Sequence, residues 1–216
     1  MISDGPIRRD AKCSLDLRVK ISKLPFRATQ VQPRHFAAGA LYEITSEHHS
    51  SITLMLLHRR SSSAQALLRP CIEASIRTLW LLRCVSDEQF DDFQKTQGWP
   101  GLEQIIGKVE GVYRKGGFLR KLIPKRDTLN DLTHGGFLTI ADRLYPFMAK
   151  NDAALPSAER AQEIVAALCI RIADRMLCLA ATAMHTEFGN LEAAVSIKQA
   201  YISALAVYEL RQPSEN

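Results

Sequence analysis

The sequence predicts an all-α protein, an antiparallel helical bundle of about five main helices with a short extended arm at its N-terminus. Most segments between Gly, Pro and Ser breaks carry apolar residues three or four positions apart, the period of an amphipathic helix. Residues 61–86 are apolar on nearly every face, as the central helix of a bundle is. A chain of 216 residues suits one domain with a substantial core. We expect an arm and linker at 1–33, a single bundle domain at 34–212 and a tail at 213–216.

The composition favours a cytoplasmic protein without a membrane partner. Hydrophobic residues make up 46% of the chain and charged residues 24%, which is ordinary for a globular protein. The longest apolar stretch is interrupted by Glu73, Arg77 and Arg83, so no membrane span is expected. The first residues lack the pattern of a signal peptide. The five cysteines include no C-x-x-C pair, which argues against structural zinc and a disulfide framework.

The N-terminal arm holds the net positive charge of the chain. Residues 1–34 contain eight Lys and Arg against three Asp, and this excess equals the +5 of the whole sequence. The high isoelectric point therefore describes an arm rather than a basic domain, and it is weak evidence for nucleic-acid binding. Between Cys13 and Lys23 apolar and polar residues alternate, which predicts one short strand. Its apolar positions are Leu15, Leu17, Val19 and Ile21.

The first main helix is expected from Arg34 to Arg60. On this helix His48 lies within an apolar stripe, and His49 points about 100° away from it. The stripe consists of Ala37, Leu41, Ile44, Ile52 and Met55.

The central helix, residues 61–86, carries charges on one line. Arg69, Glu73 and Arg77 follow at four-residue steps, so they stack along one face of the helix. Pro70 removes the hydrogen-bond partner of the Ala66 carbonyl if the helix runs through it. The short break at Ser61–Ser63 makes this helix an antiparallel neighbour of the first, which turns His48 toward Arg69 and Glu73.

The remaining helices follow from caps and breaks. Thr128 to Asp131 is similar to a capping box and predicts a helix from about Leu129, in which Asn130 and His134 lie one turn apart. This helix either ends at Gly135-Gly136 or, as we prefer, continues through the two glycines to Lys150. The basic window 113–126 is interpreted as a solvated connection rather than a phosphate site. The other helices are expected at 87–97, 102–115, 157–188 and 191–210. The third of these has an apolar stripe of Ile164, Leu168, Ile172, Met176 and Leu179.

Three motifs together carry a resemblance to a known family. They are Glu47-His48-His49, the run Leu68-Arg69-Pro70-Cys71-Ile72-Glu73, and the run from Asn130 through Thr133-His134-Gly135-Gly136. With these motifs the chain resembles a family of bacterial all-helical proteins described only as a domain of unknown function, and it is similar to the wider HEPN class. The resemblance implies a HEPN-like bundle, a homodimer, and RNA or a nucleotide as partner in defence or stress response.

The sequence departs from the HEPN nuclease motif, which places an Arg four to six residues before a His on one helix. Here seven residues separate Arg126 from His134. An Arg–His pair would have to come from separate helices, as Arg69 with His134 or His48.

Two functional hypotheses follow. In a metal-independent ribonuclease, His134 would be the base, Arg69 would stabilise the phosphorane, and His48 or Glu73 would be the catalytic partner. Asn130 and Arg77 would then bind substrate. In a non-catalytic binding or regulatory module, the same residues form a structural polar network in which Glu73 pairs with Arg69 and Arg77. No cofactor is expected, and the absence of Glu-x-x-His pairs argues against a metal site.

Overall fold

The fold is seen in a computed structural model, which describes residues 5–26, 28, 30–96, 98–113, 116–124, 127–128, 130, 133, 144–145 and 157–209. All the regular secondary structure with assigned bounds in this part of the chain is helical. The long helices are α1 (Pro6–Ser22), α2 (Pro33–Leu57), α3 (Ser61–Cys84), α9 (Ala158–Glu187) and α10 (Leu191–Glu209). The short helices are α4 (Asp87–Thr96), α5 (Leu102–Tyr113) and α6 (Phe118–Leu122).

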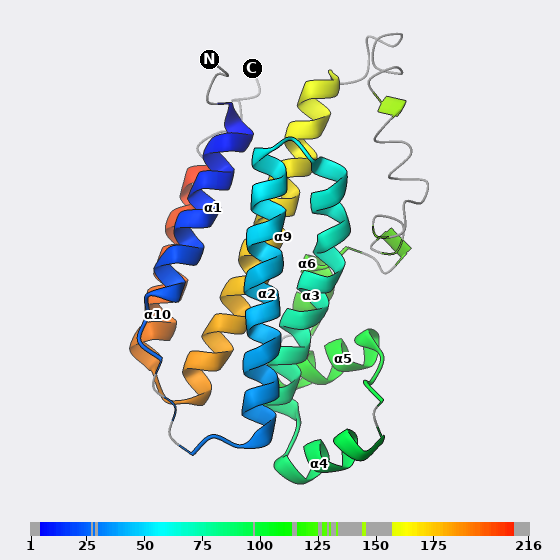
Figure 1. Cartoon of the computed structure of the whole chain (residues 1–216), viewed down its shortest axis with the longest axis vertical. Helices are drawn as coiled ribbons and strands as arrows, with labels where there is room; N and C mark the ends of the chain where they lie inside the picture. Colours follow the sequence, from blue (N-terminus) through cyan, green and yellow to red (C-terminus); the bar gives the residue numbers. More distant parts are fainter. Residues whose placement is uncertain are drawn as a thin grey trace.

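The five long helices run along the same axis, and the short helices α4 and α5 lie beside one end of α3 (Figure 1). Helix α3 packs against α2, α9 and α5, while α1 packs against α2, α9 and α10. Thirteen of the 24 residues of α3 are buried, because its apolar side chains meet neighbours on several faces. The prediction of a central helix here is confirmed.

The extended arm predicted at the N-terminus is wrong. Residues 13–22 belong to the helix α1, which begins at Pro6, a favourable residue at a helix N-terminus. Ser14, Leu17 and Ile21 are buried and lie three or four positions apart, whereas Val19 is 41% exposed. Residues two positions apart in a helix point about 200° away from each other, so the apparent period of two mixed the buried Leu17 and Ile21 with the exposed Val19, and the buried serine concealed the helical period.

The register predicted for α2 is also wrong. His49 is fully buried, together with Thr45 and Ile52, whereas Ile44 is 41% exposed. The buried face therefore contains polar residues, and the apolar stripe was a poor guide because it assumed that the core of this helix is apolar. The boundaries of the helix were predicted to within three residues.

Boundaries elsewhere agree closely with the sequence. Helix α9 begins after Ser157, whose hydroxyl accepts a hydrogen bond from the backbone N–H of Arg160 at 3.2 Å. Ile172 and Met176 are buried on α9 as predicted, but Ile164 and Leu168 are more than half exposed. The predicted helix at 129–150 and its Gly135-Gly136 pair lie largely outside the described residues.

Within the window 113–126, interpreted as a solvated connection, the structure contains the short helix α6. Gly117 precedes it with a φ of 76°, a left-handed backbone conformation that glycine adopts without strain. No helix of the described part of the chain is long and apolar enough to cross a membrane.

Candidate functional site

The candidate site is built on one face of α3 by Arg69, Glu73 and Arg77, which we call the α3 ladder. Arg69 Nε donates to Glu73 Oε1 at 2.8 Å, and Arg77 Nη1 lies 3.1 Å from Glu73 Oε2. The three side chains remain 30%, 17% and 24% exposed, so they line the surface rather than the interior. Two guanidinium groups share one carboxylate, which leaves one net positive charge on this face.

An amide and an indole ring extend the ladder. Arg69 Nη1 donates to Asn130 Oδ1. The guanidinium carbon of Arg77 lies 5.3 Å from the centre of the Trp99 ring, within the range of a cation–π contact. Trp99 is 44% exposed and packs edge-on against Phe93, with 4.7 Å between ring centres. The face therefore combines cationic donors, an amide and a partly exposed aromatic ring.

Four of the six predicted site residues meet here: Arg69, Glu73, Arg77 and Asn130. His134 lies outside the described residues, so its predicted approach to Arg69 stays a prediction. The ion pairs of Glu73 with both arginines are those expected if the ladder is a structural polar network, as in the non-catalytic hypothesis.

His48 lies on α2 at the level where this helix passes α3. One turn away from it, the thiol of Cys71 contacts the Thr45 carbonyl at 3.9 Å, and antiparallel packing brings His48 to the height of Leu68 and Arg69. Among the described residues we find no hydrogen bond or ion pair that joins His48 to the ladder. Burial lowers the pKa of His48, although Glu47 opposes the shift, so the imidazole is mostly neutral at neutral pH.

A buried polar cluster that the sequence analysis missed lies between α1, α2, α9 and α10. Asp174 Oδ1 accepts from Ser14 Oγ at 2.5 Å and lies 2.7 Å from His49 Nε2, and Asp174 Oδ2 accepts from Tyr208 OH at 2.6 Å. Ser14, His49 and Asp174 are fully buried and Tyr208 is 3% exposed. A sequence signal for this cluster was the acid Asp174 on α9, because the residues three and four positions away include the apolar Ile170, Leu177 and Cys178.

The combination of Ser, His and Asp in this cluster does not form a nucleophilic triad. Ser14 Oγ and the Asp174 carboxylate both lie against the same nitrogen of His49, Nε2, whereas a triad needs the acid on the opposite nitrogen. The Nδ1 atom of His49 is enclosed without a partner in the described part of the chain. Burial and the Asp174 charge raise the pKa of Tyr208, so its phenol stays protonated and donates. The geometry supports a structural role in joining four helices.

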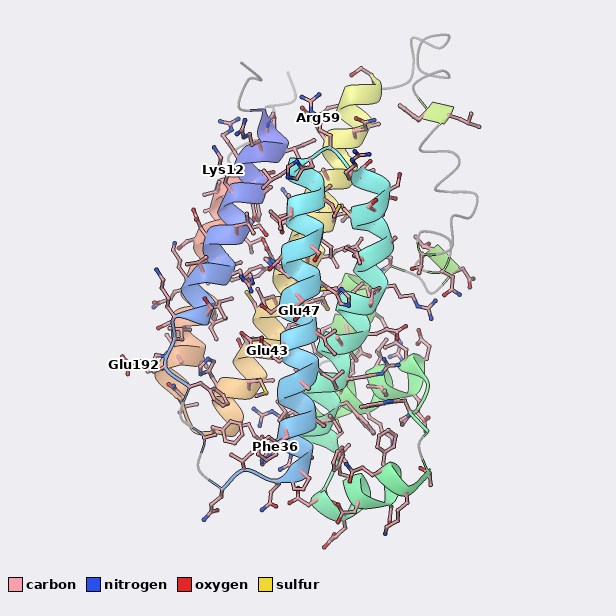
Figure 2. All side chains as sticks on the ribbon, viewed as in Figure 1. Lys12, Phe36, Glu43, Glu47, Arg59 and Glu192 are labelled. Atoms are coloured by element: carbon pink, nitrogen blue, oxygen red, sulfur yellow. The ribbon has the colours of Figure 1, made fainter. Side chains whose placement is uncertain are left out.

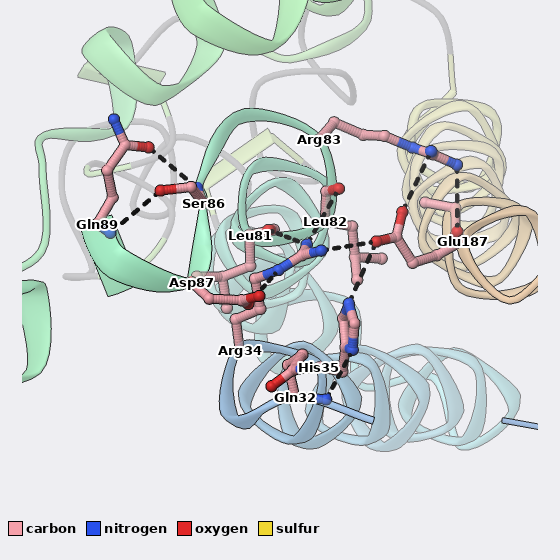
Figure 3. A network of polar contacts seen from close by, with 11 residues as sticks. Gln32, Arg34, His35, Leu81, Leu82, Arg83, Ser86, Asp87, Gln89 and Glu187 are labelled. Atoms are coloured by element: carbon pink, nitrogen blue, oxygen red, sulfur yellow. Dashed lines mark hydrogen bonds and ion pairs between the residues drawn. The ribbon is translucent and has the colours of Figure 1, made fainter. Parts of the chain in front are cut away.

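A third polar cluster surrounds Glu187 at the end of α9 (Figure 3). Glu187 Oε1 is 3.1 Å from Arg34 Nη2 and 3.2 Å from His35 Nε2, and Oε2 is 3.3 Å from Arg83 Nη1. The backbone N–H of Gln32 donates to His35 Nδ1, which assigns the proton of the neutral ring to Nε2. Each of these groups therefore has a partner, and the cluster joins the ends of α2, α3 and α9.

The part of the chain that the structure describes contains no group of three or more His, Cys, Asp or Glu side chains placed to hold a metal ion. Its five cysteines form no disulfide bond. Burial raises the pKa of Cys71 to about 12, so this thiol stays protonated at neutral pH.

Comparison with known proteins gives a family match over most of the chain. The model of a family of unknown function, DUF6988, matches residues 42–204, which include α3, α9 and most of α2 and α10. No curated protein and no solved structure matches the chain.

Proposed function

We propose that this chain, which belongs to the DUF6988 family, engages RNA or a nucleotide at the α3 ladder. The proposal places it among HEPN-like proteins of the bacterial cytoplasm that act in defence or stress response. One observation carries it: Arg69 and Arg77 share the single carboxylate of Glu73 on a partly exposed face, beside the Asn130 amide and the Trp99 ring.

The chemistry of this face suits a phosphate ester attached to a base. A guanidinium has five N–H donors, and those of Arg69 and Arg77 that are not used by Glu73 and Asn130 can bind phosphate oxygens in pairs. The partly exposed Trp99 ring offers a surface on which a base can stack. The net positive charge of the ladder attracts a polyanion before contact.

The finer proposal is a metal-independent ribonuclease. A neutral histidine takes the proton of a ribose 2′-OH, the 2′-oxygen bonds to phosphorus, and the P–O5′ bond breaks as the leaving oxygen gains a proton. The products are a 2′,3′-cyclic phosphate and a 5′-OH. His134 is the proposed base, Arg69 stabilises the charge on the phosphorane, and His48 or Glu73 is the proposed partner. The lowered pKa of His48 favours its neutral form.

The alternative function is a non-catalytic binding or regulatory module. The Asp174 cluster favours it, because this cluster is sealed from solvent and the Asp174 carboxylate takes its hydrogen bonds from Ser14, His49 and Tyr208 within the core. On this alternative the α3 ladder fixes the approach of the segment that contains Asn130 to α3, and it binds no nucleic acid.

The test compares wild type, Arg69→Ala, Arg77→Ala and His134→Ala. Arg175→Ala is the matched control, because Arg175 is exposed on α9. Affinity for a labelled single-stranded RNA is measured over a range of salt concentrations, cleavage is measured in EDTA, and growth is followed during expression. A thermal melt of each variant separates lost function from lost folding.

We expect Arg69→Ala and Arg77→Ala each to weaken RNA binding and to reduce the slope of log K against log salt by about 1. We expect His134→Ala to bind RNA without cleaving it or arresting growth. If wild type leaves RNA intact and is as harmless as the variants, the ribonuclease reading fails. If it also shows no salt-dependent binding, the non-catalytic module is the better description.

The basic N-terminal segment needs a separate control. Because Leu17 and Ile21 of α1 are buried in the core, deletion of residues 1–34 would disrupt the bundle. Substitution of the exposed Lys20 and Lys23 by Gln removes charge without removing core. RNA binding lost in this variant and retained in Arg69→Ala would assign binding to α1 instead of the ladder.

A further inference from the structure

A cavity of about 570 Å³ lies at the end of the bundle where α1 connects to α2 and where α9 ends. It is bounded by the end of α1, the first half of α2 and the end of α9 with the residue that follows it. The connection between α1 and α2 contributes Leu24, Phe26, Ala28 and Val31, and the end of α9 contributes Met184, His185 and the following Phe188. Figure 2 shows Phe36 and Glu43 on this half of α2, and both line the cavity. Its volume falls in the range of small-molecule sites. The α3 ladder contributes no residue to its lining.

One wall of the cavity is aromatic. The Phe26 ring meets the rings of His185 and Phe188 edge-on, with centres 5.5 Å and 5.1 Å apart, and His35 meets Phe188 at 5.1 Å. Phe26 is 48% exposed, so part of this wall is presented to solvent at the mouth of the cavity. Edge-to-face packing of this kind accepts a further ring in the same geometry.

Among the described residues that line the cavity, the cationic one is Arg18. Its Nε donates to Ser46 Oγ at 3.1 Å, and Ser46 is 8% exposed. No acidic side chain pairs with Arg18 among the described residues, although the exposed Glu43 also lines the cavity. Because Glu43 is at the solvent edge, its field is screened by water and salt more than that of Arg18. The guanidinium therefore has donors available for an anion.

Two further titratable side chains of the lining, His185 and Tyr42, add no charge at neutral pH. Burial lowers the pKa of His185, which keeps the imidazole neutral. Burial, assisted by Glu43, raises the pKa of Tyr42 to about 12, which keeps the phenol protonated. His35 accepts at Nδ1 from the Gln32 backbone and faces Glu187 with Nε2. One cation beside an aromatic wall is the complement of one anionic group on an aromatic ring.

We propose that this cavity binds a small aromatic carboxylate, with the carboxylate on Arg18 and the ring against Phe26, Phe188 and Met184. A phosphate or a nucleic acid fits less well, because a single guanidinium in an apolar lining cannot neutralise several charges. The proposal is independent of RNA binding at the α3 ladder, since the two sites share no side chain.

The experiment uses the full chain with naphthalene-2-carboxylate and its neutral isostere naphthalene-2-carboxamide as probes. Binding is measured by calorimetry and located with ¹³C-methyl methionine spectra. Met184 lines the cavity and reports a ring-current shift, while the buried Met176 lies outside the lining and is the internal reference.

Three variants make the test specific. Arg18→Gln removes the cation, and Arg175→Gln removes an exposed arginine outside the cavity. Gly39→Leu fills the cavity from α2; a Cβ at Gly39 meets only Met184 Cε, at 3.9 Å, and leucine favours the helix more than glycine does. We expect this variant to melt no lower than wild type.

The expected result is saturable binding of the carboxylate that shifts the Met184 methyl resonance and leaves Met176 in place. Binding should weaken about ten- to a hundredfold for the carboxamide or for Arg18→Gln, should be lost in Gly39→Leu, and should be unchanged in Arg175→Gln. Equal affinity for the two probes, an unshifted Met184 resonance, tighter binding of the aliphatic decanoate, or no binding to wild type would overturn the proposal.

Discussion

Asp174 collects three hydrogen bonds on one fully buried carboxylate, from Ser14, His49 and Tyr208. The donors come from α1, α2 and α10, so a single side chain of α9 connects four helices. A buried carboxylate is tolerable only when hydrogen bonds replace its lost hydration. Its partners in turn depend on it, because a buried hydroxyl or imidazole without an acceptor also loses free energy.

Replacement of Asp174 by Ala should therefore lower the free energy of unfolding by about 3–5 kcal/mol, the cost of leaving buried polar partners unpaired. Urea denaturation followed by circular dichroism measures it. The control is Asp92→Ala, because Asp92 is 78% exposed in a surface pair with Lys95 and should change stability by less than about 0.5 kcal/mol. Similar losses in the two variants would contradict a structural role for the cluster.

Helix α3 contains an internal proline beside the ladder. The helix continues from Ser61 to Cys84 through Pro70, although proline lacks the N–H that the Ala66 carbonyl would accept. Pro33, by contrast, stands in the first turn of α2, where the N–H is not needed. We therefore expect Pro70 to destabilise the fold and Pro33 to stabilise it.

We expect Pro70→Ala to raise the free energy of unfolding by about 1–3 kcal/mol, because alanine restores a helical hydrogen bond and has the highest helix propensity. Pro33→Ala should lower it by at most about 1 kcal/mol. Chemical denaturation of the two variants measures both. A Pro70→Ala variant less stable than wild type would mean that the packing around α3 requires the proline ring.

Helix α6 is attached to α5 through Glu110. Glu110 is 4% exposed, and its Oε1 accepts from the backbone N–H groups of Leu119 at 2.9 Å and Arg120 at 3.1 Å. Burial by itself would raise the pKa of this carboxyl. The backbone donors and the Arg120 guanidinium outweigh burial and hold the pKa below its ordinary value of 4.5.

The sign of this shift makes stability depend on pH. A carboxyl with a lowered folded pKa stabilises the fold above its unfolded pKa, and the contribution is lost as pH falls through the folded pKa. Glu110→Gln should lower the free energy of unfolding by about 1–3 kcal/mol at pH 7, and the difference from wild type should shrink below about pH 4.5. Denaturant titrations at several pH values measure it. Glu192→Gln, on an exposed residue at the start of α10, should show no such trend.

At the scale of the whole molecule, α10 is an outer helix of the bundle and lies beside α1 (Figure 1). Three of its apolar side chains are exposed. Leu191, Val195 and Ile202 are 63%, 54% and 53% exposed. Leu191 and Val195 are one turn apart, and Ile202 follows two turns later on the same side. A homodimer, which the family resemblance implies, would cover this side of the bundle if it formed through the long helices.

Light scattering coupled to size exclusion should therefore give the mass of a dimer for wild type and of a monomer for the double variant Val195→Glu, Ile202→Glu. Two charges in an apolar interface lose their hydration without gaining partners. Val112→Glu on α5 is the control, because Val112 is 51% exposed away from α10 and the dimer should persist. A wild-type monomer at every concentration would show the dimer prediction to be wrong.

The sequence alone determined the helices from α2 onward to within a few residues wherever the structure describes them, except for α6, which lies in a window predicted to be a connection. The signals for these boundaries act locally: Ser157 caps α9 through a backbone N–H three residues later, and Gly189 follows its end with a φ of 73°. The four-residue spacing of Arg69, Glu73 and Arg77 likewise sufficed to predict their ion pairs.

Only the tertiary structure decided which side of each helix faces the core. His49 rather than His48 is buried because Ser14, Asp174 and Tyr208, distant in the sequence, come together to satisfy a polar interior. The segment read as a strand is the helix α1 because α2, α9 and α10 surround it and accept Leu17 and Ile21. Local signals fix where a helix begins and ends, but burial of a polar group depends on partners that the chain supplies only once it has folded.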